Sequence, residues 1–200
     1  MRARLQYKYG VSILYHSFGI LFGLKIEGVS NVPKNGRVIL ACNHRSNYDP
    51  PLVGCCIHTR PIYYFAKKCL FNSRFSSEFL KSLNAIPVDT ENLSVKTMKK
   101  FINLLKEGEA LMVFPEGTRS KTNEFLEAQP GVGYLSLKTN TMVLPVFIKG
   151  THEPMIRHFF RRSPLLVKFG KPIYPYFKKV SKENARAFSN LILEEIKKLA

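Results

Sequence analysis

Aspartate is almost absent from this sequence of 200 residues. Asp49 and Asp89 are its only aspartates, which argues against a carboxylate cage for a metal ion and against a catalytic pair of aspartates. The five histidines include no His-x-x-x-His pair, the spacing that would place two zinc ligands on one helix face. We therefore expect no metal site.

A disulfide framework is also missing. The four cysteines stand at positions 42, 55, 56 and 69, without a Cys-x-x-Cys spacing, and the adjacent pair Cys55-Cys56 suits a bridge poorly. We expect free thiols that pack as small apolar side chains in a reducing cytosol.

The sequence has no apolar run long enough to cross a bilayer. The longest candidate, residues 11–24, is interrupted by Ser12, His16 and Ser17 and ends at Lys25, without a small-x-small cleavage site. Its aromatic and basic residues favour an amphipathic helix at the level of the lipid headgroups, and a helix that covers the core is the alternative. We expect residues 1–25 to form this interfacial helix and residues 26–200 to form one domain.

Acidic residues are few beside the basic ones. There are 31 lysines and arginines against 14 acids, so the formal charge is +17 and an anionic partner is expected. From Lys149 to Lys182 nine basic residues are opposed only by Glu153, and aromatic residues lie among them. This stretch fits an anionic membrane, a nucleic-acid surface or a solvated rim. We favour the membrane and expect no nucleic acid, because the sequence shows no helix-turn-helix, zinc finger or phosphate loop.

Short apolar runs alternate with amphipathic segments after residue 25. Helical spacing is seen in Phe71, Phe75 and Phe79 and over residues 94–106 and 185–199. Predicted strands occupy residues 38–42, 62–66, 85–88, 111–114, 142–148 and 165–169. The alternation predicts a single α/β domain with a mostly parallel sheet flanked by helices. Ligands of such sheets bind beyond the carboxyl ends of the strands.

A histidine and an aspartate follow the first of these strands. His44 and Asp49 are five residues apart, so they cannot share a helix face, but they can meet in a loop that folds back. Asp49 would then hold one imidazole nitrogen of His44 and leave the other as a base. Pro50 and Pro51 would begin the next helix. The alternative is that Asp49 caps this helix beside a histidine that binds backbone.

A second polar segment follows the strand at 111–114. It reads Pro115-Glu116-Gly117-Thr118-Arg119-Ser120, where Gly117 permits a sharp turn and Arg119 offers a planar fork of N–H groups that matches phosphate. Taken alone, the segment also fits an ordinary strand-exit loop with a surface arginine.

Together the two segments resemble the 1-acyl-glycerol-3-phosphate acyltransferase family. The resemblance covers residues 28–148, with a His-x4-Asp block at 43–49 and a Glu-Gly-Thr-Arg block at 114–120. Residues 66–68 with 82–89 are similar to the second block of the family, and 144–146 to the fourth. Thr90 stands where the family often has arginine, and Gln129-Pro130-Gly131 replaces its basic-Gly pair, so the identity of the headgroup is open.

The resemblance implies a glycerolipid acyltransferase fold and a direct transfer. His44 is the expected general base and Asp49 its partner, while Arg119 and Lys67 would bind the acceptor phosphate. Glu116, Gly117 and Thr118 are implied to line the same acceptor site. The expected partners are a lysophospholipid acceptor, an acyl thioester donor (acyl-CoA or acyl-carrier protein, with no other cofactor) and an anionic membrane surface.

The expected product is phosphatidic acid, made by a peripheral protein on the cytoplasmic face of the membrane. Two alternatives remain. One keeps the chemistry but acylates another lysolipid or glycerol phosphate. The other is a non-catalytic module that binds lipid or nucleic acid through its basic residues.

Overall fold

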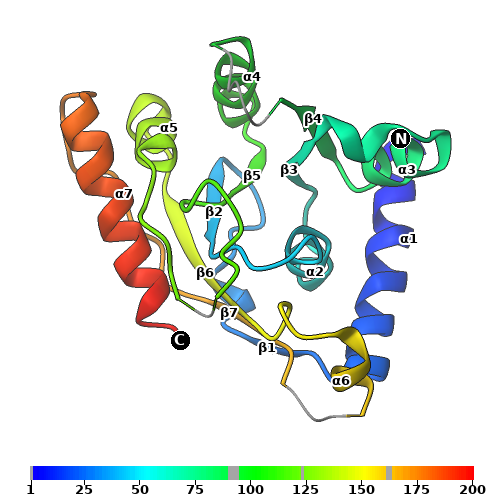
Figure 1. Ribbon diagram of the computed structural model, residues 1–200. Helices are drawn as coiled ribbons and strands as arrows, with labels where there is room; N and C mark the ends of the chain where they lie inside the picture. The colour runs from blue at the N-terminus through cyan, green and yellow to red at the C-terminus, as the bar shows by residue number, and fades with distance from the viewer. Residues whose placement is uncertain (1, 90–94, 123, 161–163) are drawn as a thin grey trace.

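The computed structural model describes residues 2–89, 95–122, 124–160 and 164–200 (Figure 1). Seven strands form one sheet in the order β1-β7-β6-β2-β5-β3-β4. The strands are β1 (Lys25–Glu27), β2 (Val38–Cys42), β3 (Ile62–Lys67), β4 (Ala85–Val88), β5 (Ala110–Val113), β6 (Val143–Lys149) and β7 (Leu166–Phe169). The α-helices are α1 (Arg2–His16), α2 (Asp49–Cys56), α3 (Arg74–Ser82), α4 (Val95–Lys106), α5 (Gly131–Thr139), α6 (Met155–Phe159) and α7 (Lys182–Lys197).

Strand direction decides which loops meet. Strands β6, β2, β5, β3 and β4 are parallel to one another. Strand β7 runs antiparallel to β6, and β1 runs parallel to β7. The sheet is therefore mostly parallel, as predicted, and the carboxyl ends of its five central strands share one edge with the amino end of β1. We call this the carboxyl edge.

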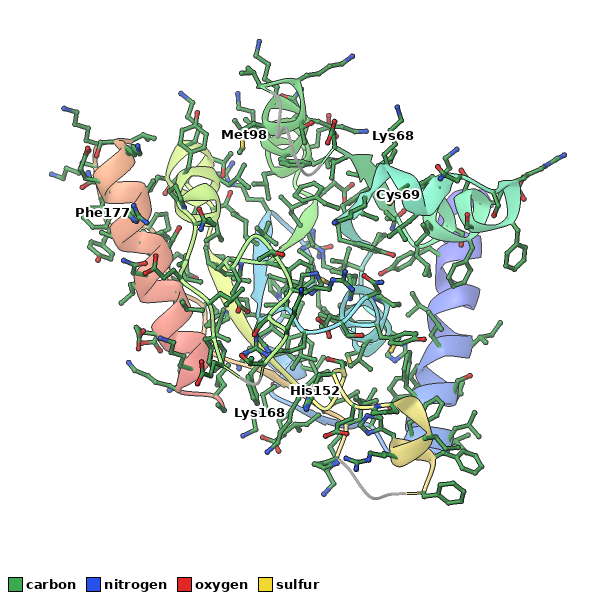
Figure 2. All side chains as sticks on the ribbon, in the orientation of Figure 1. Lys68, Cys69, Met98, His152, Lys168 and Phe177 are labelled. Atoms are coloured by element: carbon green, nitrogen blue, oxygen red, sulfur yellow. The ribbon has the colours of Figure 1, made fainter. Side chains whose placement is uncertain are left out.

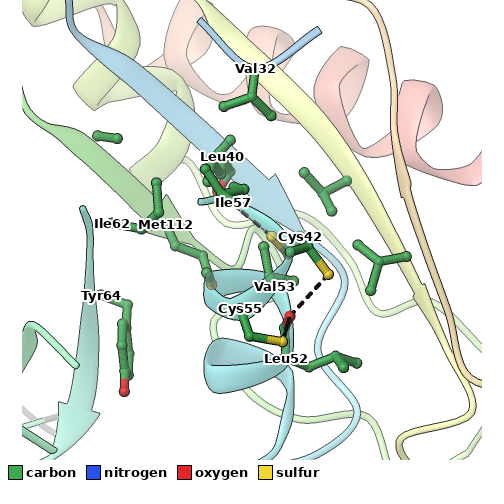
Figure 3. Close-up of a cluster of buried hydrophobic side chains, with 14 of the residues drawn as sticks. Val32, Leu40, Cys42, Leu52, Val53, Cys55, Ile57, Ile62, Tyr64 and Met112 are labelled. Carbon is green, nitrogen blue, oxygen red and sulfur yellow. Dashed lines mark hydrogen bonds between the residues drawn. The ribbon is translucent and has the colours of Figure 1, made fainter. Parts of the chain in front are cut away.

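Helices cover both faces of the sheet because both faces are apolar. In the fully buried strand β2, alternate side chains enter two different clusters: Leu40 and Cys42 one of them, Ile39 and Ala41 the other. The first cluster includes residues of α1 and α2, and Figure 3 shows part of it, with Cys42 near Leu52 and Cys55 of α2. The second includes residues of α4, α5 and α7, which lie on the other side in Figure 1.

The loops at the opposite edge of the sheet are joined by one buried arginine. The guanidinium of Arg60 donates hydrogen bonds to the carbonyl oxygens of Pro33, Gly36 and Gly108, at 3.3, 2.5 and 2.8 Å. Burial lowers the pKa of Arg60, and nearby Glu109 opposes that shift. Three connections that are distant in sequence are thus fixed together beneath the amino ends of β2, β3 and β5.

The N-terminal helix both covers the core and exposes apolar side chains. Val11 of α1 and Phe18 of the short π-helix η1 (Ser17–Leu21) are buried in the first cluster. Ile13 and Ile20 are exposed. Within the described residues, we find no helix whose length and hydropathy would let it span a membrane.

The strands follow the predicted pattern, and three elements were not predicted. Strand β1 and helices α5 and α6 are absent from the sequence-based expectation, because β1 is short and α5 is buried on several sides, which hides its period. The start of the helix predicted at Ser94 lies outside the described residues, as does Thr90. Cys42, Cys55 and Cys56 are buried free thiols as expected, but Cys69 is exposed, so that expectation was wrong for Cys69.

Candidate active site

The site begins where β2 ends. The side-chain amide of Asn43 donates a hydrogen bond to the carbonyl oxygen of Ile148 at 2.9 Å, and the Ile148 N–H donates to Asn43 Oδ1 at 2.7 Å. This pair replaces backbone pairing between β2 and β6, so the chain leaves the sheet at Asn43. The next residue, His44, is therefore held at the carboxyl edge.

His44 and Asp49 meet as predicted from their spacing. His44 Nδ1 lies 2.8 Å from Asp49 Oδ2, with the histidine side chain partly exposed and the aspartate side chain fully buried. The ring of His44 stacks on Phe114, with centroids 3.8 Å apart and planes inclined by 16°. When Nδ1 carries the proton that faces Asp49, Nε2 bears the lone pair. This tautomer leaves Nε2 able to accept a proton, and the base role of His44 stays a prediction.

One carboxylate oxygen also closes the loop between the two residues. Asp49 Oδ2 accepts the backbone N–H groups of Arg45 and Ser46 at 2.7 and 2.8 Å. Helix α2 begins at Asp49 and carries Pro50 and Pro51 in its first turn, as expected. Asp49 thus closes the loop before α2 and orients His44 at once. It does not cap the helix, because the N-cap residue is Tyr48 and no side-chain hydrogen bond caps α2, so the capping alternative was wrong.

The second carboxylate oxygen of Asp49, Oδ1, differs from Oδ2 in its hydrogen bonding. Asp49 Oδ1 is buried and has no hydrogen-bond partner among the described residues.

The thiol of Cys42, at the end of β2, stays protonated. Burial is the main cause that raises its pKa well above the ordinary value, and the charge of Asp49 adds to that rise. Cys42 is therefore a neutral thiol at neutral pH, which excludes it as a thiolate nucleophile.

Glu116, from the second segment, supports the same loop from the neighbouring strand. Its buried carboxylate accepts the backbone N–H groups of His44 and Leu126, at 2.9 and 2.8 Å. It also pairs with Arg45 at 3.1 Å, and the Arg45 guanidinium lies 5.0 Å from the ring centroid of Phe125. Glu116 therefore fixes the backbone of the base, and its contact with an acceptor stays a prediction.

The residues after Glu116 are exposed beside His44. Gly117 has a positive φ of 70°, and its N–H donates to the carbonyl oxygen of Phe114 at 3.1 Å, which makes the sharp turn expected there. The Ser120 N–H donates to the carbonyl oxygen of His44 at 3.0 Å, so the chain between them passes the base. Thr118 and Arg119 lie in this passing segment with exposed side chains.

Lys67 reaches the carboxyl edge from farther away. It is the last residue of β3 and is exposed, and β5 separates β3 from β2. The structure thus brings His44, Asp49 and Glu116 into one hydrogen-bonded group, with Gly117, Thr118 and Arg119 in the adjoining loop. Lys67 shares the edge but not that group.

Sequence reasoning assigned no role to four residues that shape this site: Asn43, Arg45, Phe114 and Phe125. All four act on the loop or ring of His44 through contacts between segments distant in the chain. The only signal was that three of them, Asn43, Arg45 and Phe114, lie within the two blocks. In the described part of the chain no group of three metal-ligating side chains gathers.

The fold and this histidine–carboxylate pair define a class of transferase. The family model described as "Acyltransferase" matches residues 23–149, and the chain belongs to this family. The matched region contains the whole hydrogen-bonded group around His44.

Individual relatives have names more specific than that of the family. The chain is 29% identical over 195 residues to the 1-acyl-sn-glycerol-3-phosphate acyltransferase of Bacillus subtilis, covering 96% of each chain. It is 28% identical over 164 residues to the enzyme of that name from Streptococcus pneumoniae, covering 80% of this chain and 60% of the relative. Its fold matches the crystal structure of the 1-acyl-sn-glycerophosphate acyltransferase PlsC from Thermotoga maritima, with a TM-score of 0.77 and 26% identity, covering 100% of this chain and 83% of that one.

Proposed function

We propose that this protein transfers a fatty acyl chain from acyl-CoA or acyl-carrier protein to the free hydroxyl of 1-acylglycerol 3-phosphate, which gives phosphatidic acid. The observation that carries the proposal is the 2.8 Å contact between His44 Nδ1 and Asp49 Oδ2 at the carboxyl edge, within the region shared with the acyltransferase family. The names of the relatives support this choice of acceptor.

In the proposed reaction His44 Nε2 removes the proton of the acceptor hydroxyl. Asp49 stabilises the imidazolium that forms, and the alkoxide oxygen attacks the thioester carbonyl carbon. The new ester C–O bond forms as the C–S bond breaks. The thiolate that leaves then accepts the proton that His44 had taken from the acceptor hydroxyl. The nucleophile is the hydroxyl of the substrate, so no acyl-enzyme intermediate is required. A positioned base accelerates such a step by about 10²–10⁴-fold.

The acceptor phosphate is assigned to the exposed cations at the same edge. Arg119 follows Gly117 and Thr118 in the loop that passes His44, and its guanidinium can bind two phosphate oxygens at once. Lys67 supplies a second cation from β3. In this assignment Glu116 contributes by holding the loop, because its carboxylate is buried and already hydrogen-bonded.

We place the protein at the cytoplasmic face of the membrane, as a peripheral protein. The lysophospholipid acceptor resides in the bilayer, and the formal charge of +17 favours an anionic partner. We choose the lipid surface over nucleic acid because the sequence shows no helix-turn-helix, zinc finger or phosphate loop.

The test is the release of thiol from acyl-CoA or acyl-carrier protein by the purified protein. We expect release that depends on added 1-acylglycerol 3-phosphate, with phosphatidic acid identified by mass spectrometry. Glycerol phosphate and lysolipids with other headgroups complete the panel, and a preference for one of them would replace the proposed acceptor. A protein that releases no thiol with any acceptor would fit the binding module instead.

The matched variants are His44→Ala and His58→Ala. His58 is an exposed histidine that follows α2 and takes no part in the site. We expect His44→Ala to fold and to lose the activity, and His58→Ala to keep it. An active His44→Ala protein, or a trapped acylated side chain, would contradict the mechanism.

A further inference from the structure

Large apolar side chains are exposed on three segments that are far apart in sequence. Phe75 of α3 is 83% exposed, Ile20 of η1 is 70% exposed, and Phe160, directly after α6, is 61% exposed. Phe79, Ile156 and Phe159 are exposed as well. We call these six residues the apolar rim.

The topology gathers these segments at the carboxyl edge. Helix α3 follows the carboxyl end of β3 through the 3-10 turn η3 (Lys68–Phe71), and α6 lies in the connection that leaves the carboxyl end of β6. The end of η1 leads into β1, whose first residue Lys25 donates its N–H to the carbonyl oxygen of Leu165 at 2.8 Å, at the base of that connection. Figure 1 shows α3, α1 and α6 in a row on one side of the sheet.

The exposure of the rim is built into the fold. In α3, Leu80 packs against the first core cluster while Phe75 and Phe79, one turn apart, form a stripe that faces outward. In α6 the ring of His158 is fully buried, with Nε2 2.9 Å from the carbonyl oxygen of Gly150. This anchor holds α6 so that Phe159 and Phe160 point to solvent, with their rings edge to face at 5.4 Å.

The rim is bordered by cations. Lys67 and Lys68 precede α3 and are exposed, and Lys149 is exposed at the end of β6, where the connection to α6 begins. Arg157 lies in α6 itself and pairs with Glu153 at 2.8 Å. Figure 2 shows Lys68 beside α3. Exposed aromatic and aliphatic side chains beside lysine and arginine have the chemistry that binds the interface of an anionic bilayer.

We propose that the apolar rim is the bilayer-docking surface of this protein, with α3, η1 and α6 as three separate points of contact. Docking through the rim brings the carboxyl edge, and with it His44, to the lipid headgroups. The proposal rests on the proposed function, because a lipid acceptor is the reason for docking to a bilayer. Vesicle binding nevertheless tests the docking without any measurement of activity.

The sequence contains no tryptophan, so a single introduced tryptophan gives fluorescence that reports on its own position alone. The three single variants Phe75→Trp, Phe159→Trp and Tyr176→Trp each place one fluorophore at an exposed aromatic position. Tyr176, 62% exposed, follows the isolated bridge between Val143 and Ile173 at the opposite edge, and it serves as the matched control. With vesicles of equal parts phosphatidylcholine and phosphatidylglycerol, we expect a blue shift of emission at positions 75 and 159 and none at 176.

Sedimentation with the same vesicles measures the strength of docking. We expect Phe75→Ser with Phe79→Ser, and Phe159→Ser with Phe160→Ser, each to weaken the partition coefficient about ten-fold or more, whereas Tyr174→Ser with Tyr176→Ser should not. Equal binding by all variants, or an equal loss in the tyrosine variant, overturns the proposal. A blue shift that appears without vesicles as protein concentration rises also overturns it and assigns the rim to self-association. If the rim variants lose vesicle binding while the parent protein itself shows no acyl transfer, the docking stands and the proposed function fails.

Discussion

A single oxygen atom organises the catalytic loop. Asp49 Oδ2 accepts from His44 Nδ1 and from two backbone N–H groups, so the loop that carries the histidine and the ring itself are fixed by one carboxylate. In the proposed mechanism Asp49 contacts His44 and not the substrate, which makes it a positioning residue. Three donors on one buried anion offset its loss of hydration.

Replacing this anion tests the positioning role. We expect Asp49→Asn to lower kcat by about 10²–10⁴-fold while KM changes little, because the carboxamide oxygen can take the place of Oδ2 towards the three donors but carries no negative charge to stabilise the imidazolium. Nitrogen chemical shifts of His44 should report Nδ1–H in both proteins, which shows that the ring keeps its orientation. A variant that keeps the parent's rate would contradict a role for the charge of Asp49.

At the scale of elements, α5 and α7 approach each other more closely than side chains normally allow. A Cβ at Gly133 of α5 would overlap the carbonyl oxygen of Ala185 in α7, and the Gly133 N–H donates to Ser189 Oγ at 2.9 Å. Helix α7 thereby lies directly against α5 and closes the second core cluster. Glycine is required at position 133 for its small size and not for a left-handed backbone.

This contact predicts a specific loss of stability. Gly133→Ala should lower the free energy of unfolding by about 1–3 kcal/mol, because the two helix backbones must separate. For a domain of this length the melting temperature falls by about 2–4 °C for each kcal/mol. Thermal unfolding followed by circular dichroism measures it.

The control lies in the same helix. A Cβ at Gly131, the first residue of α5, would meet nothing within 4 Å, so Gly131→Ala should leave the melting temperature unchanged or slightly raised. Equal melting temperatures for the two alanine variants would show that α5 and α7 are not packed as described.

At the scale of the whole molecule, we expect the attachment of the N-terminal helix to the sheet to depend on pH. Tyr7 of α1 is buried, and its hydroxyl oxygen accepts the N–H of Ile62, the first residue of β3, at 3.2 Å. Burial is the main cause that raises the pKa of Tyr7 from 10.0 to about 12. The neutral phenol is thus favoured in the folded state, so its contribution is complete below pH 10 and is lost as the pH rises toward 12.

The expected loss can be isolated with Tyr7→Phe, which cannot ionise at this position. At a pH of about 11, one unit above the unfolded value, the parent should have lost about 1.4 kcal/mol more than the variant, relative to neutral pH. Urea unfolding of both proteins at the two pH values gives the difference. Parallel losses in the two proteins would mean that Tyr7 does not carry this dependence.

The fold also divides a stretch that looks continuous in the sequence. Lys149 lies at the carboxyl edge, whereas Ile173 pairs with Val143 at the start of β6, so the basic residues from 171 to 182 begin at the opposite edge. Arg161 and Arg162 lie outside the described residues. The exposed tyrosines at 174 and 176 consequently belong to a different surface from Phe159 and Phe160.

The sequence by itself determined the α/β class, the positions of most strands and the meeting of His44 with Asp49. Strand periodicity and apolar runs are local properties, and a loop of four residues between His44 and Asp49 leaves few ways to fold back. The pattern also located the turn at Gly117. These features depend on neighbours along the chain, which a sequence displays directly.

Only the tertiary structure decided what the segment 115–120 contacts and which apolar side chains are buried or exposed. Glu116 meets His44 across 72 residues, and Asn43 meets Ile148 across 105, through contacts created by the order of strands in the sheet. The helical spacing of Phe75 and Phe79 predicted a helix, which the structure confirms as α3, but only the structure shows that both side chains are exposed. Periodicity shows that a helix has an apolar side, but the burial of that side depends on which element, if any, packs against it.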